Sequence, residues 1–362
     1  MRVFVINPGS TSTKLALYEG EHQLISREYR HDKTRMAQFS SVIDQLDFRM
    51  TAIRETLKEA GIDTASINGV AGRGGLLHPL EGGVYEVNET MLSDLSEARY
   101  GEHPCNLGAI LANELALEWG VSAFIVDPVV TDEMMDIARL TGLPGVRRRS
   151  LFHALNQRGA ARTVAARLGK PYDKLNCIVC HMGGGTSIGA HCQGKVVDVI
   201  NALDGEGPFT PERTGGMPLL PMLDMIDRGD LSTERLREII QREGGVYAHL
   251  GTNDMMDIEN RVKAGEPEAS EIFEAMAYGI ARYASSLVPA FAASGKARRV
   301  DAIVLTGGLA RCNPLVDRVA DLTQTIAPVE AVTGDEEMAA LAAGARRVLL
   351  KEEEAKTYTS AP

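Results

Sequence analysis

The sequence predicts a mixed α/β protein built from two related lobes. The chain has 362 residues, which is more than one hydrophobic core usually holds and favours about two domains. Residues 2–30 alternate apolar and polar side chains in three runs separated by turn residues, the pattern of three antiparallel strands. From residue 176 the same order of strand, glycine turn, strand and strand begins again. These observations favour a duplicated fold, with one lobe of residues 1–148 plus 336–362 and a second lobe of residues 149–335.

The two copies of this strand pattern align without a gap. Placing Asn7 on His181 also aligns three further pairs: Gly9 with Gly183, Ser12 with Thr186, and Gly20 with Gly194. Hairpins of equal length indicate duplicated lobes.

The other elements follow from apolar periodicity and from residues that end helices. In the first lobe we expect a helix over 36–60, a strand within 66–72, a helix over 106–119 and a strand over 122–128. Further along we expect helices over 221–228, 233–242 and 269–293, a strand within 301–308, a helix over 313–326, a strand over 328–332 and a closing helix over 336–350. The tail from residue 351 is expected to be solvated and frayed.

Composition narrows the class of protein. The net charge is -11 and no segment carries a run of Lys or Arg, which argues against a nucleic-acid partner. No stretch reaches the roughly 20 apolar residues of a membrane span, and the apolar run after Met1 is too short for a secretory signal. We therefore expect a cytoplasmic protein with no membrane partner. Cys177 and Cys180 form a C-x-x-C motif without a second pair, so the five cysteines are expected to be buried reduced thiols.

The first candidate site is the turn NPGSTSTK, residues 7–14. Gly9 permits a positive φ and a close approach of the backbone, four hydroxyl side chains follow it, and Lys14 supplies a cation. Such a turn suits a phosphate group, although a Ser/Thr-rich hairpin with an exposed lysine explains it equally well.

The second candidate site is HMGGGTS, residues 181–187, where three glycines separate two strands. Backbone N–H groups without neighbouring side chains can surround phosphate oxygens. The motif is neither a Walker loop nor a dinucleotide fingerprint, because it joins two strands and does not open a helix.

The third candidate site is VLTGGLARCNPL, which places Gly307 and Gly308 at the end of a strand. Asn313 is expected to be the N-cap of the following helix and Pro314 its first residue. Glycines there let a flat ring lie against the backbone. Alone, this pattern favours ordinary packing, but the three glycine sites together favour a nucleotide.

Taken in order, these motifs resemble those of the acetate and butyrate kinase family, within the superfamily of actin-like, sugar-kinase and heat-shock ATPases. The resemblance covers nearly the whole chain and includes GEHPCNLGA, FIVDP, SLFHALNQ, CHMGGGTS, DGEGPFTPERTGG, LTGGLARCN and GDEEM. NPGSTSTK, GRGGLLHPLEGGVYEV and FTPERTGGMP are more similar to the butyrate-specific members. The resemblance implies a duplicated actin-like (ribonuclease H-like) fold with an interlobe nucleotide cleft, and a homodimer or higher homo-oligomer.

The resemblance also implies which residues bind ATP or ADP with Mg²⁺. The first phosphate loop corresponds to Asn7, Ser10, Ser12 and Lys14, and the second to His181, Gly183, Gly184, Gly185 and Thr186. The adenosine segment corresponds to Gly307, Gly308 and Asn313, although Ala310 and Arg311 depart from the Gly-Glu of acetate kinases. Asn7 and Glu336 are expected near the metal, with Glu337 as the rival.

Four residues correspond to the family's catalytic positions. Arg73 is expected to hold the substrate carboxylate, since a guanidinium fork matches two carboxylate oxygens, and Asp127 corresponds to the catalytic aspartate. His153 and Arg213 are expected to contact the transferring phosphoryl group. The implied substrate pocket comprises Arg73, Gly75, His103, Phe152 and Pro211. Each of these residues also has a plainer structural explanation. The arginines would be solvated, Asp127 would cap a helix before Pro128, and the histidines would be structural.

The implied reaction moves the γ-phosphoryl of ATP onto the carboxylate of a short-chain fatty acid, butyrate or a branched relative. A carboxylic acid with a pKa near that of Glu is already ionised at neutral pH, so no general base is needed. Gly75 stands where acetate kinases carry valine, and we hypothesise that it leaves room for a longer acyl tail. The alternatives are an acetate or propionate kinase and an actin-like ATP-binding module without acyl kinase activity.

Overall fold

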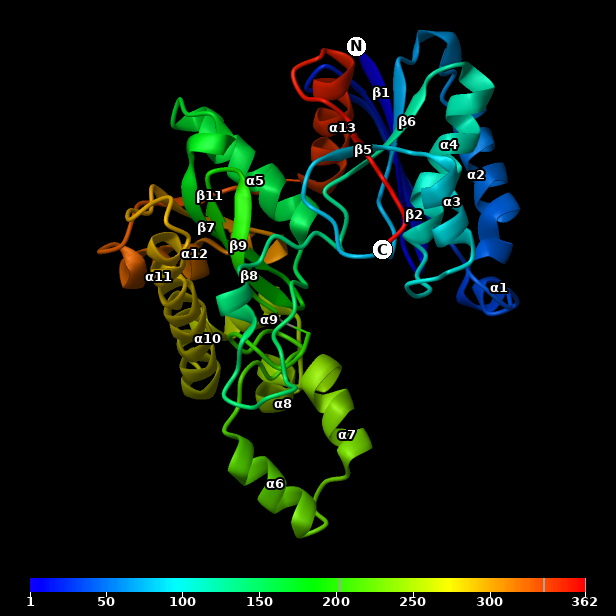
Figure 1. The fold of residues 1–362 in the computed structure, drawn as a ribbon. Coiled ribbons are helices and arrows are strands. Elements are labelled where there is room, and N and C mark those ends of the chain that lie inside the picture. Colours follow the sequence, from blue (N-terminus) through cyan, green and yellow to red (C-terminus); the bar gives the residue numbers. More distant parts are fainter. Residues whose placement is uncertain (202, 335, 362) are drawn as a thin grey trace. The chain divides into compact units, whose positions relative to one another are not determined.

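The computed structural model describes residues 1–201, 203–334 and 336–361, without the side chains of Lys33 and Glu336 (Figure 1). Its internal contacts divide it into two compact units, residues 1–132 with 336–361 and residues 133–334. The division lies earlier than residue 148, where the sequence placed it. Glu133 accepts hydrogen bonds from Arg158 and from the Val196 N–H, and Arg148 bonds to Asp198, so residues 133–148 belong with the second unit.

The first unit is built on a mixed sheet whose strands lie in the order β12-β5-β6-β4-β1-β2-β3. The expected meander is present as β1, Arg2–Pro8, β2, Ser12–Glu19, and β3, His22–Arg30, paired antiparallel. The other strands are β4, Gly69–Gly72, β5, Val84–Glu86, β6, Ser122–Val126, and β12, Lys356–Thr357. Strand β4 runs parallel to both β1 and β6, so β1, β4 and β6 end at the same edge of the sheet.

Helices cover both faces of this sheet, with α13 on one face and α2 to α4 on the other (Figure 1). Their bounds are α1, Lys33–Met36, α2, Leu46–Glu59, α3, Glu89–Ser96, α4, Asn106–Trp119, and α13, Glu336–Leu349. The single helix expected over 36–60 is wrong. The structure has α2 only from Leu46. Asp44, just before it, accepts a hydrogen bond from the backbone N–H of Ser41, the kind of bond found at the start of a helix and not in its interior. The sequence also missed α3, which Asn88 caps by accepting from the Met91 N–H.

The expectation of a frayed tail is also wrong. Strand β12 pairs with β5, and the side chain of Tyr358 is only 1% exposed. Its hydroxyl donates to Oδ2 of Asp94 at 2.7 Å. The tail therefore closes the core of the first unit, and its polar run concealed one anchoring aromatic residue.

The second unit repeats the arrangement of the first, with the strand order β11-β10-β7-β8-β9. Its strands are β7, Asn176–Met182, β8, Thr186–Cys192, β9, Lys195–Ile200, β10, Ala302–Thr306, and β11, Val329–Ala331. Strand β7 pairs antiparallel with β8 and parallel with β10, as β1 pairs with β2 and β4. The predicted duplication is confirmed.

Helix α5 packs on β7 and β10, while α10 and α11 pack on β7, β8 and β9. The helices of the second unit are α5, Ala154–Arg167, α6, Leu219–Asp227, α7, Thr233–Glu238, α8, Gly245–Leu250, α9, Met255–Lys263, α10, Pro267–Ser286, α11, Val288–Ala293, and α12, Asn313–Thr323. The sequence missed α5, α8 and α9. The expected helix over 269–293 is interrupted at Leu287, two residues before Pro289, because proline cannot donate the hydrogen bond that a continuous helix needs.

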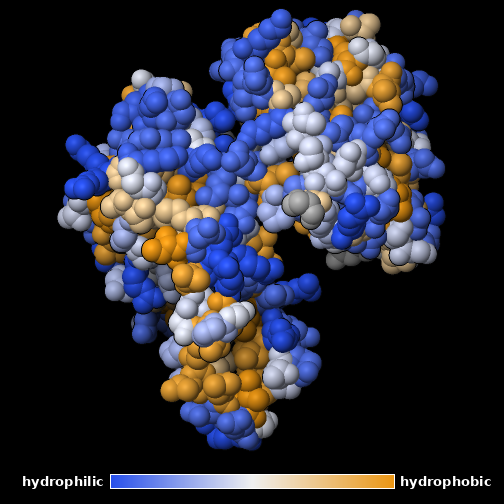
Figure 2. Space-filling model, viewed as in Figure 1, coloured by the Kyte–Doolittle hydropathy of each residue, from blue (hydrophilic) through white to orange (hydrophobic). Residues whose placement is uncertain are grey.

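Three surface and core features complete the description. All five cysteines are free and buried, as predicted. Among the described residues, the helices are too short or too polar to cross a membrane. Helix α6 buries none of its side chains: Leu219, Leu220 and Leu223 are 78%, 73% and 53% exposed, and Figure 2 shows apolar surface over this helix.

Candidate active site

The first expected phosphate turn, residues 7–14, lies between β1 and β2. Asn7 stands opposite Lys14 in the hairpin register, and the Gly9 N–H donates to the carbonyl of Ser12 at 2.8 Å. Ser10 and Thr11 are exposed at the tip, whereas Lys14 is half-buried. The turn therefore presents hydroxyl groups and a backbone bend outward from a fixed hairpin.

A buried arginine that the sequence analysis missed lies against this turn. Arg49 of α2 is 0% exposed and donates to the carbonyls of Gly9 at 2.8 Å and Ser12 at 3.2 Å, and to the Thr13 hydroxyl at 2.7 Å. Gln45 accepts two further bonds, and Nε2 of His31 lies 3.4 Å from Nη1 of Arg49. Burial lowers the pKa of Arg49 to about 10, so the guanidinium keeps its charge at neutral pH. A cation with neutral acceptors makes this turn electropositive. The sequence signal that could have revealed Arg49 is a charged residue on the apolar face of an amphipathic helix.

Arg73 follows β4 and meets Asn7 at the same sheet edge. Its Nη1 lies 2.9 Å from Oε2 of Glu337 and 3.4 Å from Oδ1 of Asn7. Asn7 donates to the same Glu337 oxygen at 3.1 Å. The Glu336 side chain, named for the metal, lies outside the described residues, so its rival Glu337 is the described carboxylate at this place.

Two glycines bring α4 onto the strand that carries Arg73. A Cβ on Gly72 would lie 2.0 Å from the carbonyl oxygen of Gly108, and one on Gly108 would lie 2.2 Å from that of Arg73. The Arg73 N–H donates to the Ile6 carbonyl at 2.9 Å. The backbone of Arg73 is therefore held between β1 and α4.

Gly75 serves the same packing, which corrects the hypothesis that it opens an acyl pocket. A Cβ there would lie 2.5 Å from Cα of Asn106 and 2.7 Å from Cδ2 of Leu95. The space beside Gly75 is filled by α3 and α4, so a larger residue would displace these helices before it narrowed a substrate site.

Asp127 ends β6 in a strained conformation. Its φ is 40°, a region that residues other than glycine seldom adopt. Its N–H donates to the Gly83 carbonyl at 2.9 Å and its Oδ1 accepts from the Gly83 N–H at 2.7 Å. The strain at a sheet edge that also carries Arg73 supports a functional position, while the paired bonds with Gly83 give the carboxylate a structural role as well.

His103 precedes α4, in the same unit. Its Nδ1 lies 2.9 Å from Sγ of Cys105. The pKa of His103 is lowered, first by desolvation from the surrounding protein and then by the charge of Arg73. The neutral imidazole is thus favoured beside the proposed carboxylate site.

In the second unit, two histidines named from sequence lie together. The rings of His153 and His181 are parallel within 10°, with centroids 3.7 Å apart. Nδ1 of His153 lies 2.8 Å from the Ser187 hydroxyl, and Nδ1 of His181 lies 2.7 Å from Oδ1 of Asn156. The sequence analysis overlooked Asn156 in this arrangement, although it follows His153 in the SLFHALNQ motif.

Arg213 lies over the second glycine turn. A Cβ on Gly185 would lie 2.1 Å from Nη1 of Arg213, so the glycine makes room for the guanidinium. The Thr210 hydroxyl donates to the Gly184 carbonyl and accepts from the Arg213 N–H at 2.9 Å, which ties the two segments together. Burial lowers the pKa of Arg213, and the charge of Glu212 opposes that shift.

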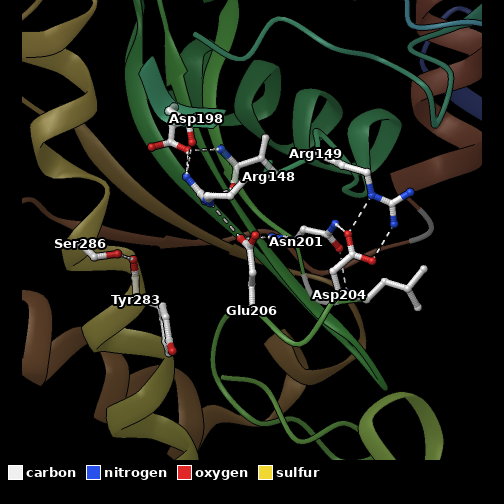
Figure 3. Close-up of polar contacts among 11 residues, drawn as sticks. Arg148, Arg149, Asp198, Asn201, Asp204, Glu206, Tyr283 and Ser286 are labelled. Atoms are coloured by element: carbon white, nitrogen blue, oxygen red, sulfur yellow. Dashed lines mark hydrogen bonds and ion pairs between the residues drawn. The ribbon is translucent and has the colours of Figure 1, made fainter. Parts of the chain in front are cut away.

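Two adjacent arginines anchor the loop that leads to Arg213 (Figure 3). Arg148 bonds to Asp198 at 3.0 Å and to Glu206 at 3.2 Å. Arg149 makes a two-pronged contact with Asp204, at 2.6 and 2.9 Å. These contacts fix Asp204 and Glu206, a few residues before Thr210.

The expected adenosine segment follows β10. Gly307 has a φ of 85°, and its Cβ would lie 2.5 Å from the carbonyl oxygen of Met182, whereas Gly308 has open space where a side chain would be. The assignment of Asn313 as N-cap is off by one residue: Cys312 is the N-cap and α12 begins at Asn313, which is exposed.

The two remaining pocket residues are buried. Phe152 is 4% exposed and packs in a small core with Ala154, Val196 and Val199. The carbonyl of Pro211 accepts from the Tyr247 N–H at 3.0 Å. Both residues therefore have a packing role in the second unit.

The donor set suits Mg²⁺ bound chiefly through phosphates. Among the described residues, no group of three or more His, Cys, Asp or Glu side chains could hold a metal alone. Mg²⁺ usually binds one or two carboxylates with substrate phosphates and waters. Glu337, beside the amide of Asn7, fits that requirement.

Comparison with known proteins now decides the family. The sequence pattern of the Acetokinase family matches residues 139–359. The chain belongs to the acetokinase family. Relatives named "Probable butyrate kinase" include one from Maridesulfovibrio salexigens, 48% identical over 360 residues and covering 99% of each chain, and one from Oleidesulfovibrio alaskensis, 49% identical over 364 residues and covering 98% of each.

Solved structures agree with the fold of this acetokinase family member. Porphyromonas gingivalis acetate kinase matches with a TM-score of 0.75 at 22% identity, over 96% of this chain and 99% of that one. A propionate kinase from Francisella tularensis matches with a TM-score of 0.67 at 17% identity, over 95% and 98%. At these identities the likeness establishes the fold alone, and the duplicated actin-like fold is confirmed.

Proposed function

We propose that this protein is a butyrate kinase, which moves the γ-phosphoryl of ATP reversibly onto the carboxylate of butyrate or a branched short-chain acid. The products are an acyl phosphate and ADP. One observation carries the proposal: each unit has a phosphate-type turn with an arginine against it, Arg49 at the first and Arg213 at the second. The near full-length identity to proteins named probable butyrate kinases supports the choice of acid.

The residues would act by positioning and by charge. Arg73 binds the acceptor carboxylate, which needs no general base because it is already ionised. Arg213 and His153 donate to the oxygens of the transferring phosphoryl group, whose charge spreads over three oxygens in a loose transition state. Asn7 and Glu337 would hold Mg²⁺, which would supply further charge neutralisation when bound. Asp127 orients neighbouring groups and takes no proton from the acceptor.

We assign nucleotide contacts to three segments, one turn in the first unit and one turn and the adenosine segment in the second. Ser10, Ser12 and Lys14 bind phosphate oxygens, while Gly183 to Gly185 and Thr186 offer backbone N–H groups. The open side of Gly308 suits a flat purine ring.

The test is an acyl-chain series. Acyl phosphate formed from MgATP is trapped with hydroxylamine for acetate, propionate, butyrate, isobutyrate and isovalerate, each over a range of concentrations. A maximum of kcat/KM at butyrate or a branched acid is expected. A maximum at acetate or propionate would change the proposed acid but leave the proposed reaction unchanged.

Failure with every acid would leave the rival, an actin-like ATP-binding module. A thermal-shift measurement separates this outcome from loss of the nucleotide site. MgATP at about 100 times its Kd stabilises a protein by about 2.7 kcal/mol, so the melting temperature should rise with MgATP and rise less with EDTA present. If MgATP does not raise the melting temperature, both the kinase and the ATP-binding module are excluded.

We also propose that the protein is a cytoplasmic homodimer or higher homo-oligomer. Five free cysteines suit a reducing compartment. The exposed leucines of α6 provide an apolar surface that a second copy could cover.

A further inference from the structure

A chain of buried hydrogen bonds runs through the second unit to His153. It begins at the Tyr172 hydroxyl, 3.0 Å from Nδ1 of His191, and continues from Nε2 of His191 to Oε1 of Gln157 at 3.1 Å. Nε2 of Gln157 reaches the Ser187 hydroxyl at 2.9 Å, and that hydroxyl reaches Nδ1 of His153 at 2.8 Å. Three of these residues, His191, Gln157 and Ser187, are at most 1% exposed, so water does not compete for their bonds.

The orientation of Gln157 fixes the direction of the whole chain. Its Nε2 also lies 3.0 Å from the backbone carbonyl of Ser187. A carbonyl only accepts, so this end of the amide must be the NH₂ group and Oε1 must face His191. Nε2 of His191 therefore carries hydrogen and donates, and its Nδ1 accepts from Tyr172. Burial keeps the pKa of His191 well below its ordinary value and raises that of Tyr172, which agrees with a neutral ring and an intact hydroxyl.

The same reasoning assigns the proton of Ser187. Its hydroxyl oxygen faces two donors, Nε2 of Gln157 at 2.9 Å and the His153 backbone N–H at 3.3 Å. These two hydrogens occupy the acceptor positions of the oxygen, so its own hydrogen points to Nδ1 of His153.

We propose that this chain holds the neutral His153 ring as the Nε2–H tautomer, so that it meets the transferring phosphoryl as an uncharged hydrogen-bond donor. Ser187 and Gln157 are then positioning residues, and His191 and Tyr172 keep Gln157 in its orientation. A neutral imidazole has one donor and one acceptor nitrogen, and which is which depends on the bond the other nitrogen makes. The role toward the phosphoryl group rests on the proposed function, whereas the tautomer is inferred from the contacts above.

The tautomer can be observed directly in the full-length protein. Histidine labelled with ¹⁵N gives long-range ¹H–¹⁵N spectra that distinguish the two neutral tautomers, and His153→Gln identifies the signal of His153 by its loss. At mildly alkaline pH we expect hydrogen on Nε2 and an unprotonated Nδ1. Hydrogen on Nδ1, whether in the other neutral tautomer or in a doubly protonated ring, would overturn the proposal.

Variants test the positioning role. Ser187→Ala removes the donor to Nδ1, so the tautomer signature should weaken and kcat should fall about tenfold, while KM for MgATP changes less than about threefold. Ser187→Thr keeps the hydroxyl and should restore the signature. Ser285→Ala is the matched control, because its hydroxyl bonds only within α10, to the Ala281 carbonyl at 2.7 Å. An unchanged His153 spectrum in a folded Ser187→Ala protein would contradict the proposal.

These two readouts separate the inference from the function. If no acid is phosphorylated while His153 shows the Nε2–H form, the proposed function fails and the hydrogen-bond chain stands. If acyl phosphate forms while His153 carries hydrogen on Nδ1, the proposed function stands and the inferred hydrogen-bond chain fails.

Discussion

At the scale of single residues, charge and burial decide what each arginine does. Arg73 is about one third exposed and meets Glu337, whereas Arg49 is fully buried against backbone carbonyls. Arg73 pairs with a carboxylate, the same chemical group that the proposed substrate carries. Arg49 has only neutral acceptors. An exposed guanidinium can bind a ligand directly, while a buried one acts on the loop it supports.

Replacing Arg73 by lysine should weaken binding of the acid. Lysine keeps the charge but loses the planar fork, so KM for butyrate should rise about tenfold with a smaller change in kcat. Steady-state hydroxamate assays measure both constants. Arg54→Lys is the control, since Arg54 forms a surface pair with Glu118 at 3.0 Å and its side chain is 57% exposed. Equal effects in both variants would remove Arg73 from the acid site.

His31 should make stability depend on pH. It lies in the buried network of Arg49 and Thr13, and burial followed by the charge of Arg49 lowers its pKa to about 4. The unfolded chain binds a proton at His31 below about pH 6.5, whereas the folded chain does so only below about pH 4. The unfolded state therefore binds more protons in this window, and stability falls as pH is lowered through it, by up to about 3 kcal/mol.

The variant His31→Gln isolates this effect from those of the carboxyl groups. Urea unfolding across the window should give a shallower loss of stability in the variant than in the parent protein. Some dependence should remain, because the pKa of His191 is also lowered by burial. Identical slopes in the two proteins would show that His31 ionises alike when folded and unfolded.

At the scale of elements, glycines set how closely helices approach strands. The contact between β4 and α4 places a helix backbone directly on a strand backbone at Gly72 and Gly108. Gly75 belongs to the same contact. Sequence patterns identify such glycines but do not distinguish packing from ligand binding.

Gly108→Ala should therefore destabilise the first unit and disturb Arg73. Its Cβ would lie 2.2 Å from the Arg73 carbonyl, and overpacking of this kind costs about 2–3 kcal/mol. Urea unfolding should show this loss, with a raised KM for the acid. Gly142→Ala is the control, because no atom lies within 4 Å of its Cβ position. Equal stability of the two variants would contradict the close contact.

The C-terminal strand should contribute strongly to stability. Tyr358→Ala removes a buried ring and should cost about 3–5 kcal/mol, while Tyr358→Phe removes only the bond to Asp94 and should cost about 1–2 kcal/mol. Tyr278→Ala, at a side chain 56% exposed, is the control. If Tyr358→Ala unfolds at the same denaturant concentration as the control, the tail does not close this core.

At the scale of the whole molecule, duplication places one equivalent hairpin turn in each unit, between β1 and β2 and between β7 and β8. The turns occupy equivalent positions after β1 and β7, yet each has its own arginine from a different part of the chain. The two units thus share their strand order but differ in the origin of the arginine that contacts each turn. The proposed oligomer would cover the apolar side chains of α6, which are exposed in a single chain.

Charge on α6 should break the proposed oligomer. Leu220→Glu with Leu223→Glu would place two carboxylates on the exposed apolar surface, and light scattering after gel filtration should show a smaller species than the parent protein. Leu117→Glu is the control, because Leu117 of α4 is 76% exposed in the other unit. A parent protein that is monomeric, or a variant of unchanged mass, would exclude α6 as the interface.

The sequence by itself determined the features that depend on short-range pattern. Alternation of side chains located β1 to β3 and β7 to β9, and glycines marked the turns between β1 and β2 and between β7 and β8, because each signal lies within a few residues. The limits of α4 were also found, since Gly120 ends that helix. Motif order indicated the family and most candidate residues.

The tertiary structure decided which of those residues meet. Asn7 bonds Glu337 across 330 positions and Tyr358 bonds Asp94 across 264, distances over which a single sequence carries no local signal. The same holds for Arg49 beneath the first turn and for Gln157 behind His153. Their roles arise from packing between elements, where burial removes water and leaves each polar group only the partners that the fold supplies.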